Sequence, residues 1–172
     1  MDPTSLGLYK YKDEQLTKIS KDSTEVWSVK FYDDTHLFVA KYGGVELLNC
    51  KTLESELVYE YPAGSEIQVT SIFYDDKEER VWLGTFSDGL FYYDMKKRTV
   101  LKFSVADFPK QPVWAIERNS DSTLLVGIDG QGIWELSRDG KKVLNIFKED
   151  VNDPLSLRGE GVYDILRDEK DR

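Results

Sequence analysis

Short apolar runs alternate with polar turns along the whole chain. An apolar strand, an acidic or polar turn and a second apolar strand recur in segments that begin at Val26, Val69, Val113 and Val162. The intervals between these starts are 43, 44 and 49 residues, and four-stranded propeller blades repeat at roughly 40–50 residues. The periodicity therefore predicts tandem β-propeller blades.

Each complete repeat predicts four short strands. The first strands are expected at 26–31, 69–74, 113–118 and 162–167. The second strands are expected at 37–41, 81–85 and 124–128, the third at 45–49, 90–94 and 133–137, and the outer strands at 57–61, 100–104 and 143–147. Turns rich in Asp, Ser and Gly separate them, and no segment shows a long apolar period of 3.6 residues, so the predicted fold class is all-β with almost no helix.

We expect a partial β-propeller over residues 1–172, built from blades of four antiparallel strands, with three nearly complete blades and two partial ones. The expected boundaries are 1–23 for the end of a blade, 24–66, 67–110 and 111–158 for the blades, and 159–172 for the first strand of the next blade. Blades bury their faces against their neighbours, and open ends leave apolar surface and strand edges unpaired. We therefore expect either remaining blades elsewhere in the parent protein or self-association through the open blade edges.

Charge and composition exclude several classes of partner. The net charge is −9 and the sequence pI is about 4.7, whereas nucleic acids and anionic membranes attract basic surfaces. We expect no nucleic-acid partner and no membrane contact by this segment, and no apolar run approaches the roughly 20 residues that span a bilayer. The first residues show no signal peptide, and the chain begins and ends in mid-pattern, as a piece of a longer protein would.

The sequence offers no catalytic or metal-binding constellation. The single histidine, His36, and the single cysteine, Cys50, are expected to be a solvated turn residue and a small half-buried residue. The acidic pairs Asp33-Asp34 and Asp75-Asp76 follow first strands, which favours turn chemistry over paired acid–base catalysis. Zinc-ligand spacing and a phosphate-binding loop are both absent from the sequence. We expect no catalytic residue, no metal and no cofactor.

The repeat motifs resemble the two-component regulator propeller repeat family. The best match is 69–94, where VWLGT at 81–85 corresponds to the family's W-I-G-T element, and NDPLSLRGEGVYDILRDE at 152–169 corresponds to its inter-blade loop and next first strand. Two copies depart from this pattern: LFVAK has Phe38 and Ala40 in place of Trp and Gly, and LLVGI has Leu125 and Ile128 in place of Trp and Thr.

The resemblance implies a signalling context. Such repeats are found in the extracytoplasmic sensor region of hybrid two-component sensor histidine kinases of the Bacteroides type, and their ligands are typically glycan-derived oligosaccharides. It implies a periplasmic location as part of an inner-membrane sensor. The kinase core is not in this sequence, so the resemblance implies no enzyme activity for this chain and a sensor histidine kinase as the parent protein.

Two sets of repeat-equivalent positions are candidate ligand contacts. One set consists of the second residue of each inner strand. The other set consists of residues at the end of each second strand or just after it. Loops on a rigid scaffold often carry function. Aromatic faces with a few polar groups suit a sugar, although the tryptophans also fit ordinary packing between blades. The candidate ligand-binding residues are Trp27, Lys41, Tyr42, Phe86, Trp114, Asp129 and Tyr163.

Three functions remain open from the sequence. The first is a ligand-sensing propeller segment that recognises an oligosaccharide or another small ligand. The second is a protein-interaction scaffold, and the third is a lyase or glycosidase on a propeller fold. The absence of a histidine–carboxylate constellation disfavours the enzyme, and the preference for sensing depends on the family resemblance.

Overall fold

A computed structural model describes residues 6–62, 67–105 and 107–168. It is all-β, and its described residues contain fourteen strands and no helix. The chain divides into two compact units, residues 1–69 and 70–172. The predicted fold class is confirmed: three antiparallel sheets have four strands each, as propeller blades do.

Unit 1 contains a two-stranded hairpin and one four-stranded sheet. The hairpin consists of β1 (Tyr9–Lys12) and β2 (Gln15–Lys18). The four-stranded sheet has the order β3 (Val26–Phe31), β4 (His36–Lys41), β5 (Gly44–Asn49), β6 (Ser55–Glu60). Each strand pairs antiparallel with the next one along the chain, so every connection within this sheet is a hairpin.

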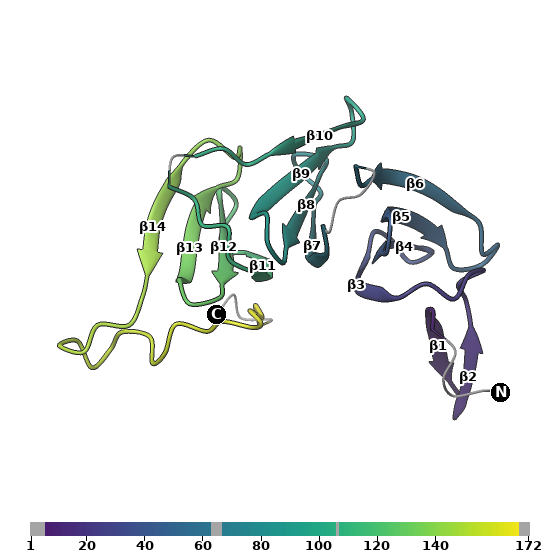
Figure 1. Ribbon diagram of the computed structural model, residues 1–172, viewed down its shortest axis with the longest axis horizontal. Helices are drawn as coiled ribbons and strands as arrows, with labels where there is room; N and C mark the ends of the chain where they lie inside the picture. The colour runs from purple at the N-terminus through teal and green to yellow at the C-terminus, as the bar shows by residue number, and fades with distance from the viewer. Residues whose placement is uncertain (1–5, 63–66, 106, 169–172) are drawn as a thin grey trace. The chain divides into compact units, whose positions relative to one another are not determined.

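Unit 2 contains two four-stranded sheets with the same order. The first consists of β7 (Val69–Asp75, whose first residue ends unit 1), β8 (Arg80–Thr85), β9 (Leu90–Asp94) and β10 (Thr99–Lys102). The second consists of β11 (Val113–Arg118), β12 (Thr123–Ile128), β13 (Gly132–Ser137) and β14 (Val143–Phe147). Figure 1 shows the two sheets with β8 beside β11, a contact between neighbouring blades.

The predicted strands agree closely with the observed ones. β3, β9, β11 and β14 have the predicted bounds, and most of the other strands differ by one or two residues at an end. The strand predicted at 162–167 is the exception: these residues form no strand with any other part of the chain that the structure describes. The blade boundaries stay predictions, although each observed sheet lies within one predicted segment.

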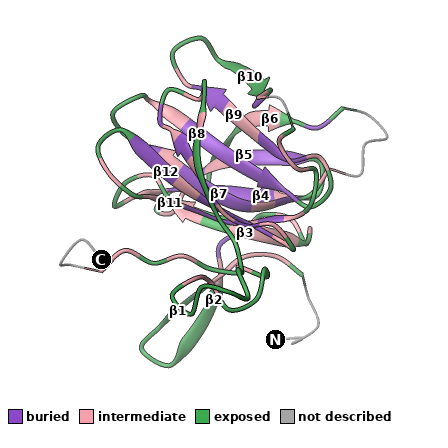
Figure 2. Cartoon of the chain, turned by 90° about the vertical axis from the view of Figure 1, so that its left-hand side faces the viewer, coloured by how far each residue is buried: buried purple, intermediate pink, exposed green. Residues whose placement is uncertain are grey.

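The second strand of each sheet is the most deeply buried. β4, β8 and β12 are buried along most of their length (Figure 2). The outer strands β6, β10 and β14 are mostly exposed. A strand covered on both faces has a continuous apolar run rather than an alternating one. This explains why the second strands read as unbroken apolar runs in the sequence.

Aromatic side chains fill the space between the two sheets of unit 2. Phe108 lies on the connection between these sheets, and its ring centroid is 4.9 Å from that of Phe103 and 5.4 Å from that of Trp134. Trp82 is completely buried, 6.1 Å from Phe103. Edge-to-face contacts at these distances are the favoured geometry for aromatic pairs. Trp82 and Trp134 are therefore packing residues.

Candidate functional site

Two of the candidate tryptophans are the extra residues of β-bulges. The register of β3 against β4 shifts around Trp27, and the register of β11 against β12 shifts around Trp114. A bulge leaves its extra residue outside the regular ladder and re-aims the side chain, and bulges are enriched beside functional sites. Sequence reasoning placed both tryptophans in strands but did not detect the bulges, whose only sequence signal is the shared Val-Trp at the strand start.

Three of the candidate residues form an aromatic cluster in unit 2, which we define as Phe86, Trp114 and Tyr163. The Trp114 ring lies 5.9 Å from the Phe86 ring and 6.1 Å from the Tyr163 ring, measured between centroids. Phe86 is 47% exposed and Tyr163 is 69% exposed, while Trp114 is half-buried. The cluster therefore presents two accessible rings on either side of a tryptophan.

The indole N–H of Trp114 is buried and has no hydrogen-bond partner among the described residues. A buried donor without a partner costs free energy. A ligand oxygen that reached this nitrogen would remove that cost.

In unit 2, a glycine in each second strand allows a close approach of the first residue of the next repeat. A Cβ on Gly84 would lie 2.6 Å from Val113 Cγ1, and a Cβ on Gly127 would lie 2.8 Å from Val162 Cγ1. Both distances are too short for any other residue type, so these glycines allow a close approach. Val162 thus contacts Gly127 as Val113 contacts Gly84, and this contact brings Tyr163 beside Trp114.

Thr70 occupies the position equivalent to Trp114 but has a structural role. Its hydroxyl donates a hydrogen bond to the Val113 carbonyl at 2.6 Å, and the Ser71 hydroxyl donates to the same oxygen at 2.9 Å. These bonds connect β7 to β11 across the two blades. The aromatic cluster therefore has no member from this repeat's inner strand.

The remaining candidates after the second strands are held by backbone hydrogen bonds. Asp129 follows β12, and its N–H donates to the Pro112 carbonyl at 2.9 Å. In unit 1, Tyr42 follows β4, and its N–H donates to the Glu25 carbonyl at 3.2 Å. Asp129 is half-buried, whereas the Tyr42 side chain is largely exposed.

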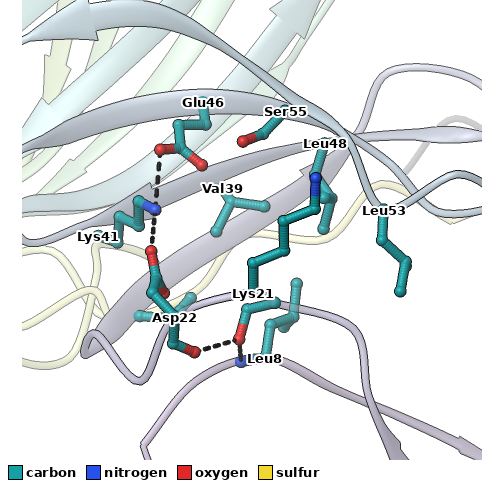
Figure 3. A pocket seen from close by; sticks show the side chains of 11 residues that line it. Leu8, Lys21, Asp22, Val39, Lys41, Glu46, Leu48, Leu53 and Ser55 are labelled. Carbon is teal, nitrogen blue, oxygen red and sulfur yellow. Dashed lines mark hydrogen bonds and ion pairs between the residues drawn. The ribbon is translucent and has the colours of Figure 1, made fainter.

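Lys41 lies in a small pocket of unit 1 between two carboxylates (Figure 3). Its Nζ is 2.5 Å from Asp22 Oδ2 and 2.8 Å from Glu46 Oε1. Burial disfavours the charged ammonium, but the hydrogen bonds to the two carboxylates outweigh it and raise the pKa of Lys41. The hydrogen bond from Lys41 lowers the pKa of Asp22. Sequence reasoning named Lys41 but missed both partners.

This pocket is too small for a sugar ring. Its volume is about 40 Å³ and apolar side chains such as Val39 and Leu48 form part of its lining. A volume of this size accommodates a few water molecules. Since the Lys41 ammonium is already occupied by two carboxylates, the aromatic cluster offers the better surface for a larger ligand.

Several polar residues of the turns are hydrogen-bonded to nearby residues. His36 begins β4 and is half-buried, so the expectation of a solvated turn histidine needs correction: its Nδ1 lies 3.0 Å from Asp33 and its Nε2 lies 3.2 Å from Asn49 Nδ2. A backbone hydrogen bond from Thr35 is the main reason why the pKa of Asp33 falls to about 2. Cys50 is half-buried, and burial raises the pKa of its thiol.

Two further searches cover only the described residues. In residues 6–62, 67–105 and 107–168, no group of three or more His, Cys, Asp and Glu side chains could hold a metal ion. The same ranges contain no helix with the length and apolarity needed to cross a bilayer.

The antiparallel four-stranded sheets define the chain as a set of β-propeller blades, and solved structures with a similar fold include two extracellular domains from B. thetaiotaomicron. The extracellular domain of BT4673 from B. thetaiotaomicron, described as part of a hybrid two component system, aligns with a TM-score of 0.77 and 19% identity over 96% of this chain and 23% of that chain. The extracellular domain of BT3049 from the same organism, described likewise, aligns with a TM-score of 0.62 and 19% identity over 86% of this chain and 18% of that chain.

A third structure shows how widely the fold occurs. The N-terminal domain of Nup159 aligns with a TM-score of 0.53 and 16% identity over 77% of this chain and 33% of that chain. The present chain spans about a quarter or less of the length of these two extracellular domains. No family model and no curated protein matches the chain. The predicted resemblance to sensor propellers is thus confirmed by structural similarity at the level of the fold.

Proposed function

We propose that the chain is a ligand-sensing segment of the extracytoplasmic, periplasmic propeller of a two-component sensor, and that its aromatic cluster contacts a glycan-derived oligosaccharide. The observation that carries this proposal is the contact of the Trp114 ring with the rings of Phe86 and Tyr163. The similarity to the sensor domains of B. thetaiotaomicron supports the signalling context.

The chemistry of the cluster suits a neutral sugar. The C–H face of a pyranose packs against an aromatic ring, and its hydroxyl groups need hydrogen-bond partners. The exposed rings of Phe86 and Tyr163 supply the apolar faces, and the Trp114 indole N–H is a donor that lacks a partner among the described residues. The net charge of −9 disfavours polyanionic glycans.

Calorimetry with a panel of neutral and acidic oligosaccharides tests the proposal. We expect heat of binding with one or more neutral members of the panel, and loss of that heat in Tyr163→Ala and Phe86→Ala. Tyr11→Ala is the matched control, because Tyr11 is an equally exposed aromatic residue on β1, outside the cluster.

The negative result has a clear meaning as well. If no oligosaccharide binds while the same protein captures a defined protein partner in a pull-down, the protein-interaction scaffold replaces the sugar-sensing proposal. Binding that is weakened as much by Tyr11→Ala as by Tyr163→Ala would remove the aromatic cluster as the site.

A further inference from the structure

The outer strand of the second sheet in unit 2 is an apolar edge. β14 is the last strand in the order β11-β12-β13-β14, and its five residues, VLNIF, include no charge. Figure 1 shows it at the border of its sheet. Leu144, Ile146 and Phe147 are 49%, 41% and 42% exposed. An edge strand with such a surface is a template for pairing with another strand.

The equivalent outer strands of the other two sheets carry charges that protect them. β6 has the sequence SELVYE, so Glu56 and Glu60 place like charges along that edge. β10 has the sequence TVLK, and it follows the basic run Lys96-Lys97-Arg98. A second copy paired along either edge would bring like charges together, which is a common protection of exposed strands. β14 has no charge within the strand, and its register against β13 shifts at Leu144.

The charges on either side of β14 are opposite in sign. Lys141 and Lys142 precede the strand, with Lys141 Nζ 3.2 Å from Asp139 Oδ2, and Glu149 and Asp150 follow it. Lys148 lies between them, but its Nζ donates a hydrogen bond to Gln131 Oε1 at 2.9 Å on the same sheet. In an antiparallel pair of two β14 strands, the basic end of one copy lies against the acidic end of the other, and opposite charges across strands stabilise pairing.

From this arrangement we infer that β14 is a self-association edge, which pairs antiparallel with β14 of a second copy of this chain. The two copies are related by a twofold axis near the middle of the strand, as an isologous interface requires. Leu144 and Ile146 of each copy then pack against those of the other. A contact between two five-residue strands is small, so the dimer forms reversibly and depends on protein concentration.

Asn145 limits this pairing in the monomer. Its Oδ1 accepts a hydrogen bond from the N–H of Ile146 at 2.9 Å. A side chain that accepts a hydrogen bond from a nearby backbone N–H competes with strand pairing for that N–H. Pairing requires the Asn145 amide to turn away, so a residue without an amide at this position favours the dimer.

Sedimentation velocity over a wide concentration range tests the inference. The wild-type chain shifts from monomer to dimer as concentration rises. Ile146→Lys abolishes this shift, because it places two like charges at the centre of the interface. Leu101→Lys is the matched control: Leu101 is 43% exposed on β10, so the same substitution there leaves the wild-type shift unchanged.

Two further sets of variants separate loss of the dimer from loss of folding: one reverses the charges on either side of β14, and the other is expected to strengthen the dimer. Replacing both Lys141 and Lys142 with Glu weakens the dimer at least several-fold, and adding Glu149→Lys and Asp150→Lys to that variant restores it. Asn145→Val tightens the dimer. Circular dichroism checks that each variant keeps its sheet content.

Each remaining outcome overturns the inference. A wild-type chain that stays monomeric at all concentrations excludes β14 as a self-association edge. A dimer that survives Ile146→Lys, or that Leu101→Lys disrupts equally, forms through a different surface. Oligosaccharide binding by Ile146→Lys stays at the wild-type level, so failure here is distinguishable from failure of the sensing proposal.

Discussion

Arg138 and Asp75 form a buried ion pair that joins the two blades of unit 2. Arg138 follows β13, and Asp75 ends β7. The guanidinium donates from Nε to Asp75 Oδ2 at 2.7 Å and from Nη2 to Asp75 Oδ1, and it also reaches Asp76 at 3.1 Å. The hydrogen bond to Asp75 raises the pKa of Arg138 although burial opposes this. A two-pronged contact of this kind fixes orientation as well as distance.

Breaking this pair is expected to destabilise unit 2 strongly. Asp75→Ala leaves the Arg138 guanidinium buried without its main partner, and removing one member of a buried pair typically costs about 3–5 kcal/mol. We expect the free energy of unfolding, measured by urea titration, to fall by about that amount. Lys141→Ala is the control, because it removes the exposed Lys141–Asp139 pair, and such pairs contribute about 0–1 kcal/mol. Equal losses in the two variants would contradict this role.

The low pKa of Asp33 predicts a specific pH dependence. Its folded-state pKa is about 2, below the usual value of about 3.9 for an aspartate side chain. The stabilisation from the charged carboxylate is therefore fully present above the unfolded-state pKa and is lost as the pH falls through the folded-state pKa.

A charge-removing variant isolates this contribution. Asp33→Asn keeps a carbonyl oxygen in the turn but cannot titrate. We expect the urea midpoints of wild type and Asp33→Asn to differ at pH 7 and to converge as the pH approaches 2. Asp34→Asn is the control at the neighbouring position. A difference between wild type and Asp33→Asn that stays constant down to pH 2 would show that the charge of Asp33 does not stabilise the turn.

Local features of the fold were predictable from the sequence because local patterns encode them. The apolar run of β12 is bounded by a polar turn and a glycine turn, so its limits were predicted to within one residue. Trp82 lies inside a strand between the apolar residues Val81 and Leu83, which correctly indicated a buried packing residue. The repeat pattern also identified Phe86 and Trp114 as candidate ligand contacts, and their rings are in contact.

Features that depend on distant pairing were not predictable. Arg138 bonds Asp75 across 63 positions of sequence, and no short-range pattern marks that pairing. Asp75-Asp76 was expected to serve turn chemistry; Asp75 does accept a hydrogen bond from the N–H of Glu78, but its main partner is on the next blade. The partners of Lys41 likewise come from elsewhere: Asp22 precedes its sheet, and Glu46 lies on the adjacent strand.

Gly127 connects the packing of unit 2 to the aromatic cluster, and this connection gives the last prediction. A Cβ at this position would lie 2.8 Å from Val162 Cγ1 and 3.1 Å from the Val162 carbonyl oxygen. Gly127→Ala therefore pushes the segment that carries Tyr163 away from β12. Overpacking of this kind typically costs about 1–3 kcal/mol, which a urea titration measures. The displaced Tyr163 should also weaken oligosaccharide binding several-fold in calorimetry.

The matched control for this prediction is Gly43→Ala in unit 1. Gly43 has a φ of +92° and no atom within 4 Å of the added Cβ, so the substitution strains the backbone without a packing clash. We expect it to lower the free energy of unfolding while oligosaccharide binding stays at the wild-type level. If Gly127→Ala loses stability but binds as tightly as wild type, Tyr163 does not need its observed contact with Trp114, and the ligand surface must be assigned to other residues.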